Sequence, residues 1–289
     1  RLLDTEVLTT GLLPGLTELA PVQLEGSLVA PRNYFNLAIQ APHIVYLDWD
    51  VDSLNIRAYA GDTAALFVLT TPLVKRGEED FLENAILNGQ FLDNVGQVTF
   101  KAASDDGIER FGLGLQAILS NTPKETRITL APLQVIDFKA WTVDPKNQIR
   151  IASDGVDIRN FVMAGNGQSI RVEGATSNLA DGKTGLDMAV DIERLNFNNF
   201  EILTAAVLSE LDGWAEAHLK IRGTTEAPQV RGTMQLHQTS FTPVQTDVRY
   251  RLSETPLEFT ESGVVLDGLI LRDPFDKTLK INGKIATTD

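Results

Sequence analysis

Leu219 to Leu236, which reads LKIRGTTEAPQVRGTMQL, is the stretch that indicates the fold most directly. Apolar and polar residues alternate over residues 219–222 and again over 230–236, as is typical of strands with one buried face. Between these segments, Gly223 can adopt a positive φ and Pro228 lacks an N–H, so a regular ladder cannot continue through the connection. The stretch therefore predicts two strands joined by a turn.

The first half of this stretch recurs along the chain. The pattern apolar, polar, apolar, polar, glycine is found at residues 22–26, 170–174, 219–223 and 279–283. The intervals between the four glycines are unequal, whereas a strict solenoid would keep one period. We therefore expect loosely repeated hairpins, in which a strand ends at each of these glycines.

Alternation with period two dominates the rest of the chain, with turn-forming residues about every ten residues, which is the rhythm of an all-β meander. Residues 98–100 and 111–115, separated by Ser104 to Gly107, form a hairpin signal. Pro42 is expected to close a strand that begins near Phe35. The mixed pattern of residues 81–92 fits either a short helix or a strand.

One segment departs from the alternation. Residues 200–211 read FEILTAAVLSEL, are rich in Ala and Leu, and are followed by Gly213. Helix formers with apolar residues near one face predict a short helix near residues 201–211, packed against the sheet or capping it.

Charge and composition exclude several classes of partner and chemistry. The 289 residues carry a formal net charge of −14, which would repel phosphate backbones and makes nucleic acid a poor candidate ligand. The absence of cysteine excludes disulfides, thiolate nucleophiles and cysteine-ligated metals. No apolar run reaches the roughly 20 residues of a membrane-spanning helix. Arg1 in place of methionine is compatible with an excerpt from a longer protein.

Asp48, Asp50 and Asp52 match the opening D-x-D-x-D of a calcium loop. The match then fails, because Ser53 stands where the tight turn needs glycine and Tyr59 where a bidentate glutamate belongs. We therefore interpret the three aspartates as the polar face of a strand.

No other motif supports a catalytic, cofactor or metal site. His43, His218 and His237 show no metal-ligand spacing, although the last two could lie on neighbouring strands. The Gly165 to Gly167 segment lacks the remainder of a phosphate loop and is interpreted as a turn. No G-x-S-x-G elbow occurs. We predict that the chain is not an enzyme and uses no cofactor.

The remaining signal is a continuous apolar strand face, which permits two interpretations. It could close the core of a sandwich, or it could line a trough too wide for its own side chains to fill, occupied by acyl chains or unfolded strands. Alternation alone favours the closed core, because packed interiors leave few sizeable voids.

Residues 211–224, LDGWAEAHLKIRGT, followed by residues 228–236, PQVRGTMQL, resemble the TamB family, the translocation and assembly module subunit of the AsmA-like superfamily. In that family a strand ends in Gly-Thr, and Pro-x-apolar-x-Gly opens the next. The resemblance continues through residues 241–250 and 264–285 and is best over about residues 211–289. Residues 148–202 resemble the looser AsmA-like repeats, and residues before about 111 fit only in rhythm.

This resemblance implies a mainly β fold, an elongated curled antiparallel sheet or β-taco-like trough, with one or two short helices. It divides the chain into residues 1–110, an N-terminal β-rich segment of the same sheet, and residues 111–289, the TamB/AsmA-like segment. It implies a periplasmic location in a diderm bacterium, with the full-length protein anchored in the inner membrane through regions outside this chain.

The implied function is a hydrophobic conduit for phospholipid between the two membranes, a guide for outer-membrane β-barrel assembly, or both. The implied partner is an outer-membrane barrel insertase of the TamA type. Two other functions remain open: a periplasmic or surface β-sandwich scaffold or adhesin, and a polysaccharide-active β protein with Asp, Arg and aromatic residues in one cleft.

Alternate residues of a strand share one face, and this alternation identifies the side chains that would line the trough. A bulge would turn the lining residues that follow it in the strand to the outer face. The predicted lining residues are Ile149, Ile151, Ile158, Ile170, Val172, Leu186, Met188, Val190, Leu219, Ile221, Val230, Met234, Leu236, Leu266, Ile270, Leu279 and Ile281.

Overall fold

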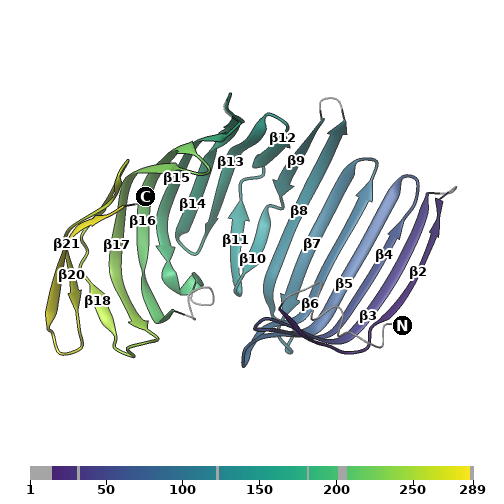
Figure 1. The fold of residues 1–289 in the computed structure, drawn as a ribbon, viewed down its shortest axis with the longest axis horizontal. Coiled ribbons are helices and arrows are strands. Elements are labelled where there is room, and N and C mark those ends of the chain that lie inside the picture. Colours follow the sequence, from purple (N-terminus) through teal and green to yellow (C-terminus); the bar gives the residue numbers. More distant parts are fainter. Residues whose placement is uncertain (1–14, 31–32, 122–123, 181, 201–206, 287–289) are drawn as a thin grey trace. The chain divides into compact units, whose positions relative to one another are not determined.

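The computed structural model describes residues 15–30, 33–121, 124–180, 182–200 and 207–286. These residues are almost entirely antiparallel β-strand and contain no α-helix (Figure 1). The expected mainly β, curled antiparallel fold is confirmed.

The chain divides into two compact units, Arg1–Trp141 and Thr142–Asp289. The division expected at residue 110 falls inside a strand, Glu109–Asn121.

The first unit is a single antiparallel sheet. Strands β2 to β9 form a meander in which each pairs with the next, while β1 pairs with the end of β3 and β10 pairs with β8. The strands are β1 (Leu16–Leu19), β2 (Gln23–Val29), β3 (Tyr34–Tyr46), β4 (Trp49–Ala60), β5 (Ala64–Arg76), β6 (Glu79–Leu92), β7 (Val95–Ala103), β8 (Glu109–Asn121), β9 (Lys124–Leu130), β10 (Leu133–Ile136) and β11 (Lys139–Val143), the last of which crosses into the second unit.

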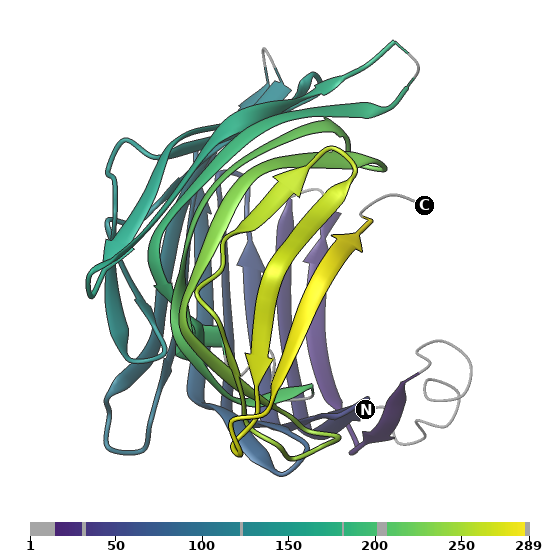
Figure 2. The ribbon, with the colours of Figure 1, turned by 90° about the vertical axis from the view of Figure 1, so that its left-hand side faces the viewer.

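The second unit continues in the same style. Strands β12 to β17 form a meander, β18 and β19 both pair with β17 and with β20, and β21 pairs with β20. Figure 2 shows β16 and β17 bent into an arc. The elements are β12 (Gln148–Ala152), β13 (Gly155–Gly165), β14 (Gln168–Asn178), β15 (Thr184–Asn196), the 3₁₀ turn η3 (Phe197–Phe200), β16 (Leu208–Thr224), β17 (Pro228–Pro243), β18 (Tyr250–Leu252), β19 (Leu257–Thr260), β20 (Gly263–Arg272) and β21 (Thr278–Ile285).

The hairpin predicted at residues 219–236 is confirmed as the β16–β17 pair. Leu219 lies opposite Gly232, and Ile221 lies opposite Val230. Thr224 and Ala227 close the turn through backbone hydrogen bonds of 3.2 and 3.3 Å. The hairpin at residues 98–115 is confirmed as β7 and β8, and the ambiguous residues 81–92 lie in strand β6.

The predicted helix near residues 201–211 is wrong where the structure describes it. Residues 201–206 lie outside the described residues, and Leu208 begins β16. Leu208 lies opposite Pro243 and Ser209 opposite Thr242, so the ladder with β17 satisfies backbone groups that a helix would have satisfied internally. Tertiary pairing has overridden local helix propensity.

The expectation that strands end at the repeated glycines holds only at Gly223, one residue from the end of β16. Gly26, Gly174 and Gly283 lie inside β2, β14 and β21. Gly174 has a φ of +140°, and a Cβ there would collide with the carbonyl oxygen of Asp187 on the neighbouring strand. This glycine permits close approach of two strands rather than a chain reversal.

Two prolines lie inside strands, opposite residues with positive φ. Pro42 does not end its strand, because β3 continues to Tyr46. It lies between the pairs of β3 and β4 that flank Ser53, which has a φ of +49°. Pro72 of β5 lies in the same way opposite Asn84, which has a φ of +46°. Each proline is placed where the irregular partner strand breaks the regular ladder, so its missing N–H is tolerated.

We predict that Gly174→Ala destabilises the second unit by about 1–3 kcal/mol, because alanine at this φ is strained and meets the backbone of β15. Gly283→Ala is the matched control, since its Cβ would meet nothing within 4 Å and its φ is not positive. Urea unfolding of both variants measures the difference. Equal unfolding midpoints would contradict the role given to Gly174.

Candidate functional site

One face of the second unit's sheet is apolar, as the cross-strand register shows. Residues directly opposite each other in an antiparallel pair point to the same face. Met188 lies opposite Ile221, which lies opposite Val230, and in the adjacent row Val190 lies opposite Leu219. These rows run across β15, β16 and β17, so the apolar side chains of three strands form one surface.

This surface, the C-terminal apolar face, includes sixteen of the seventeen predicted lining residues. They are Ile149, Ile151, Ile158, Ile170, Val172, Leu186, Met188, Val190, Leu219, Ile221, Val230, Met234, Leu236, Leu266, Leu279 and Ile281. The sequence prediction omitted further members of the same face: Val156, Phe161, Met163, Ile192, Leu257, Phe259, Val264, Leu269 and Leu271.

Ile270 is the exception and lies on the opposite face. The register shifts between Leu266 and Leu269, at Gly268 with a φ of +72°, and Ile270 then lies opposite Lys280. The Gly268 N–H donates to Asn282 Oδ1 at 2.8 Å, which holds the bulge in place. This one-residue phase change brings Leu269, only 8% exposed, onto the apolar face.

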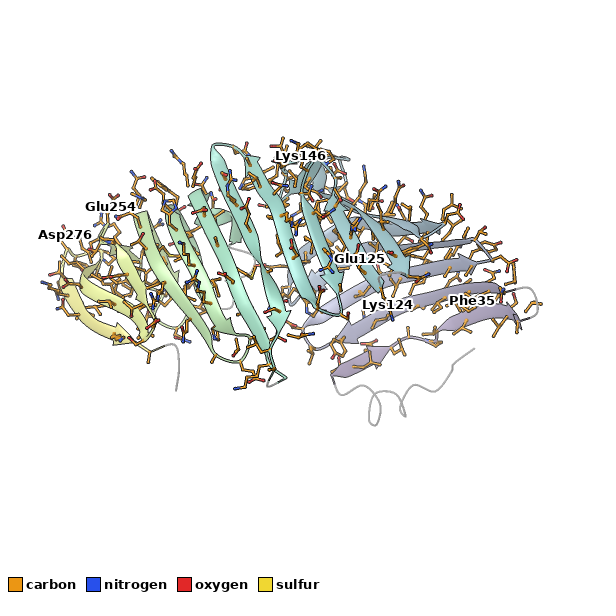
Figure 3. The ribbon with its side chains drawn as sticks, turned by 90° about the horizontal axis from the view of Figure 1, so that it is seen from above. Phe35, Lys124, Glu125, Lys146, Glu254 and Asp276 are labelled. Atoms are coloured by element: carbon orange, nitrogen blue, oxygen red, sulfur yellow. The ribbon has the colours of Figure 1, made fainter. Side chains whose placement is uncertain are left out.

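The opposite face of this unit is polar, and some of its charged side chains form cross-strand pairs. Arg222 Nε donates to Asp187 Oδ1 at 3.2 Å, and His218 Nδ1 lies 2.9 Å from Asp191 Oδ1. Lys220, between Arg222 and His218 in sequence, is exposed on the same face. Apolar and ionic residues are therefore segregated to the two sides of one sheet. Figure 3 shows side chains on both sides of the strands.

Within the described part of the second unit, every strand belongs to one sheet, and no α-helix or separate second sheet is present to cover the apolar face. Among the described elements of this unit, the 3₁₀ turn η3 lies outside the sheet, and it contacts β16. Leu219, Ile221, Met188 and Val190 are half-buried rather than buried. Ten hydrophobic residues of the described chain are buried, and five of those are alanine, so large apolar side chains are not packed into a closed core.

The first unit has an equivalent surface, the N-terminal apolar face, which the predicted lining set did not include. One row across β3 to β9 contains Leu37, Ala58, Phe67, Gly89, Val98, Leu115 and Leu130. A Cβ on Gly89 would collide with the Phe67 ring, so this glycine makes room for the aromatic side chain on the face. The period-two alternation of the sequence is the signal from which these face residues could have been predicted.

The three aspartates of the calcium-like motif have separate partners. Arg76 Nε donates to Asp48 Oδ2 at 2.9 Å, and this hydrogen bond holds the pKa of Asp48 below its usual range. Asp50 lies 3.3 Å from His43, and Asp52 accepts a hydrogen bond from Ser53 at 2.9 Å. In the part of the chain that is described, no three His, Asp or Glu side chains are grouped to hold a metal.

Aromatic and charged residues do gather around Trp214 on the polar side of β16. The His237 ring stacks on Trp214 at 3.7 Å, and the Arg194 guanidinium lies 5.2 Å from the indole centroid. His237 Nε2 lies 3.9 Å from Glu216 Oε1, and His237 Nδ1 lies 3.7 Å from Glu254 Oε2. Because the strands flanking β16 on both sides contribute these contacts, the indole is engaged by protein and offers no free platform for a sugar ring.

No family model, curated protein or solved structure matches this chain. Among the residues placed by the structure, no helix has the length and apolarity needed to cross a membrane.

We predict that Asp48→Asn flattens the acid limb of the pH–stability profile of the first unit. The folded-state pKa of Asp48 is lowered by Arg76, so its contribution is present above the usual aspartate pKa of about 3.9 and is lost as pH falls through the folded-state value. Thermal melts between neutral and acidic pH, with Arg76→Gln as the reciprocal variant, measure this contribution. Unchanged pH dependence in both variants would refute it.

Proposed function

We propose that the chain is a non-enzymatic segment of a periplasmic protein of the TamB/AsmA type, which shelters phospholipid acyl chains as they pass between the inner and outer membranes. The observation that carries this proposal is the apolar face of each unit's sheet, over which the described elements of that unit form no second sheet or α-helix. A contiguous apolar surface that stays partly exposed is a mark of interaction with apolar ligands or partners.

The energetics suit a binding surface that needs no catalytic group. Each methylene moved from water onto an apolar surface gains about 0.8 kcal/mol when fully buried. The rows of Ile, Val, Leu and Met on the C-terminal apolar face continue from strand to strand, so an acyl chain would meet similar contacts along its length. Similar affinity at successive positions favours movement along a surface over tight retention at one site.

The charges of the second unit are compatible with this cargo. The Arg222–Asp187 and His218–Asp191 pairs lie on the face away from the acyl chains, so lipid binding would not desolvate them. A phospholipid headgroup would remain in water beyond the strand ends. The negative net charge does not oppose binding that depends on the acyl chains.

A role in outer-membrane barrel assembly, with an insertase of the TamA type as partner, belongs to the same proposal, because an unfolded amphipathic strand would present similar apolar side chains. A β-sandwich adhesin is less well supported, since a sandwich needs two facing sheets and the described strands belong to one sheet. The engaged indole of Trp214 gives no support to polysaccharide binding.

We predict that Met188→Asp reduces bound phospholipid at least tenfold, because a carboxylate on the apolar face must be desolvated when an acyl chain covers it. The measurement is quantitative mass spectrometry of lipid retained after the chain is incubated with phospholipid vesicles and repurified without detergent.

Ala189→Asp is the matched control, because Ala189 is adjacent in β15 but lies opposite Lys220 on the polar face. It should retain lipid at the level of the unaltered chain. Absence of lipid from the unaltered chain, or equal loss in both variants, would overturn the proposal.

A further inference from the structure

Strand β2 forms an exposed edge of the first unit. Among the described residues, β2 pairs only with β3, and all seven of its residues are exposed. Leu24 and Leu28 are 57% and 75% exposed. Because Leu24 lies opposite Ile39 and Leu28 opposite Phe35, both leucines belong to the N-terminal apolar face.

Apart from the charge of Glu25, this edge lacks the features that usually prevent strand pairing. Residues 23–29 read QLEGSLV and contain no lysine, arginine or proline. Their register with β3 continues without a bulge from Gln23 to Val29. A regular edge with exposed apolar side chains is a template for another strand.

The sequence of β2 is nearly symmetric about Gly26. If a second copy pairs antiparallel with Gly26 opposite Gly26, then Leu24 lies opposite Leu28 in both directions and Glu25 lies opposite Ser27. Shifting the dyad to Glu25 places two glutamates opposite each other and sets Leu24 opposite Gly26 and Leu28 opposite Val22. A twofold axis that passes between two residues would set apolar side chains opposite polar ones. The apolar faces of the two copies would then lie on opposite sides of the joined sheet.

We propose that two copies of this chain associate through antiparallel pairing of their β2 strands, with Gly26 on the twofold axis. The pairing gives hydrogen-bond partners to the backbone groups of each β2 that face away from β3, and it brings four leucines together on one side of the joined sheet. The two N-terminal apolar faces then become continuous across the interface, with Phe35 of each copy beside the leucines; Figure 3 labels Phe35 near this edge. This inference does not depend on the cargo of the apolar faces.

Cysteine cross-linking tests the register, because the natural chain contains no cysteine. Glu25→Cys and Ser27→Cys chains, carrying different affinity tags, are mixed and oxidised. The proposed register places these two positions directly opposite, whereas two copies of either position are offset diagonally, beyond ordinary disulfide reach. The mixed disulfide should exceed either homodimer several-fold.

Analytical ultracentrifugation of the full chain provides the independent measurement. Leu28→Asp should raise the dimer dissociation constant at least tenfold, since it places a carboxylate against Leu24 of the second copy. Leu66→Asp is the matched control: Leu66 is 47% exposed but lies on the inner strand β5, opposite Tyr59 and Gln90. It should leave the dissociation constant unchanged.

Three results would overturn the proposal. One is a monomer at all concentrations of the unaltered chain. The second is a dominant Glu25→Cys homodisulfide, which would place the dyad elsewhere. The third is preferential cross-linking of Ser27→Cys to Lys284→Cys, which would assign β21, a strand that pairs only with β20 among the described residues, as the partner of β2.

Discussion

The antiparallel register is the constraint on which the rest of the structure depends. It places Met188 opposite Ile221 and Ile221 opposite Val230, so an apolar position on one strand determines the neighbouring position on the next. Because side chains alternate with period two, a shift of one residue would exchange the apolar and the ionic face of a strand. Segregation of apolar side chains from ion pairs therefore follows from hydrogen bonding of the backbone.

Irregularities in the ladder adjust this arrangement without destroying it. In β13 and β15 the register shifts next to Asn160 and Arg194, both with a φ near +50°, yet the apolar residues before and after each shift remain on one face. Bulges increase local bending and twist, and the strands that carry them are bent. Curvature is thus added at a few positions while the apolar surface stays continuous.

Sequence patterning could predict the strand class, the 219–236 hairpin and the face of most apolar residues, because each depends on local alternation. It could not predict that Ile270 is reversed, since Gly268 gives no local sign of which strand face follows its bulge. The Ala- and Leu-rich segment at residues 200–211 suggested a helix because composition reports only local propensity. The pairing of Leu208 with Pro243 is a long-range contact, which local propensity does not include. The N-terminal apolar face was accessible from the same alternation as the predicted lining set.

Because the apolar face is half-exposed, direct contact between its side chains and phospholipid can be measured. Ile221 and Lys220 are neighbours on β16 whose side chains stand on opposite faces. The most direct measurement places a photo-activatable phenylalanine analogue at each position in turn and counts acyl-labelled phospholipid cross-linked after incubation with vesicles. We expect strong labelling from position 221 and little from position 220, because only position 221 faces the proposed lipid-binding surface. Equal labelling, or labelling mainly from 220, would contradict it.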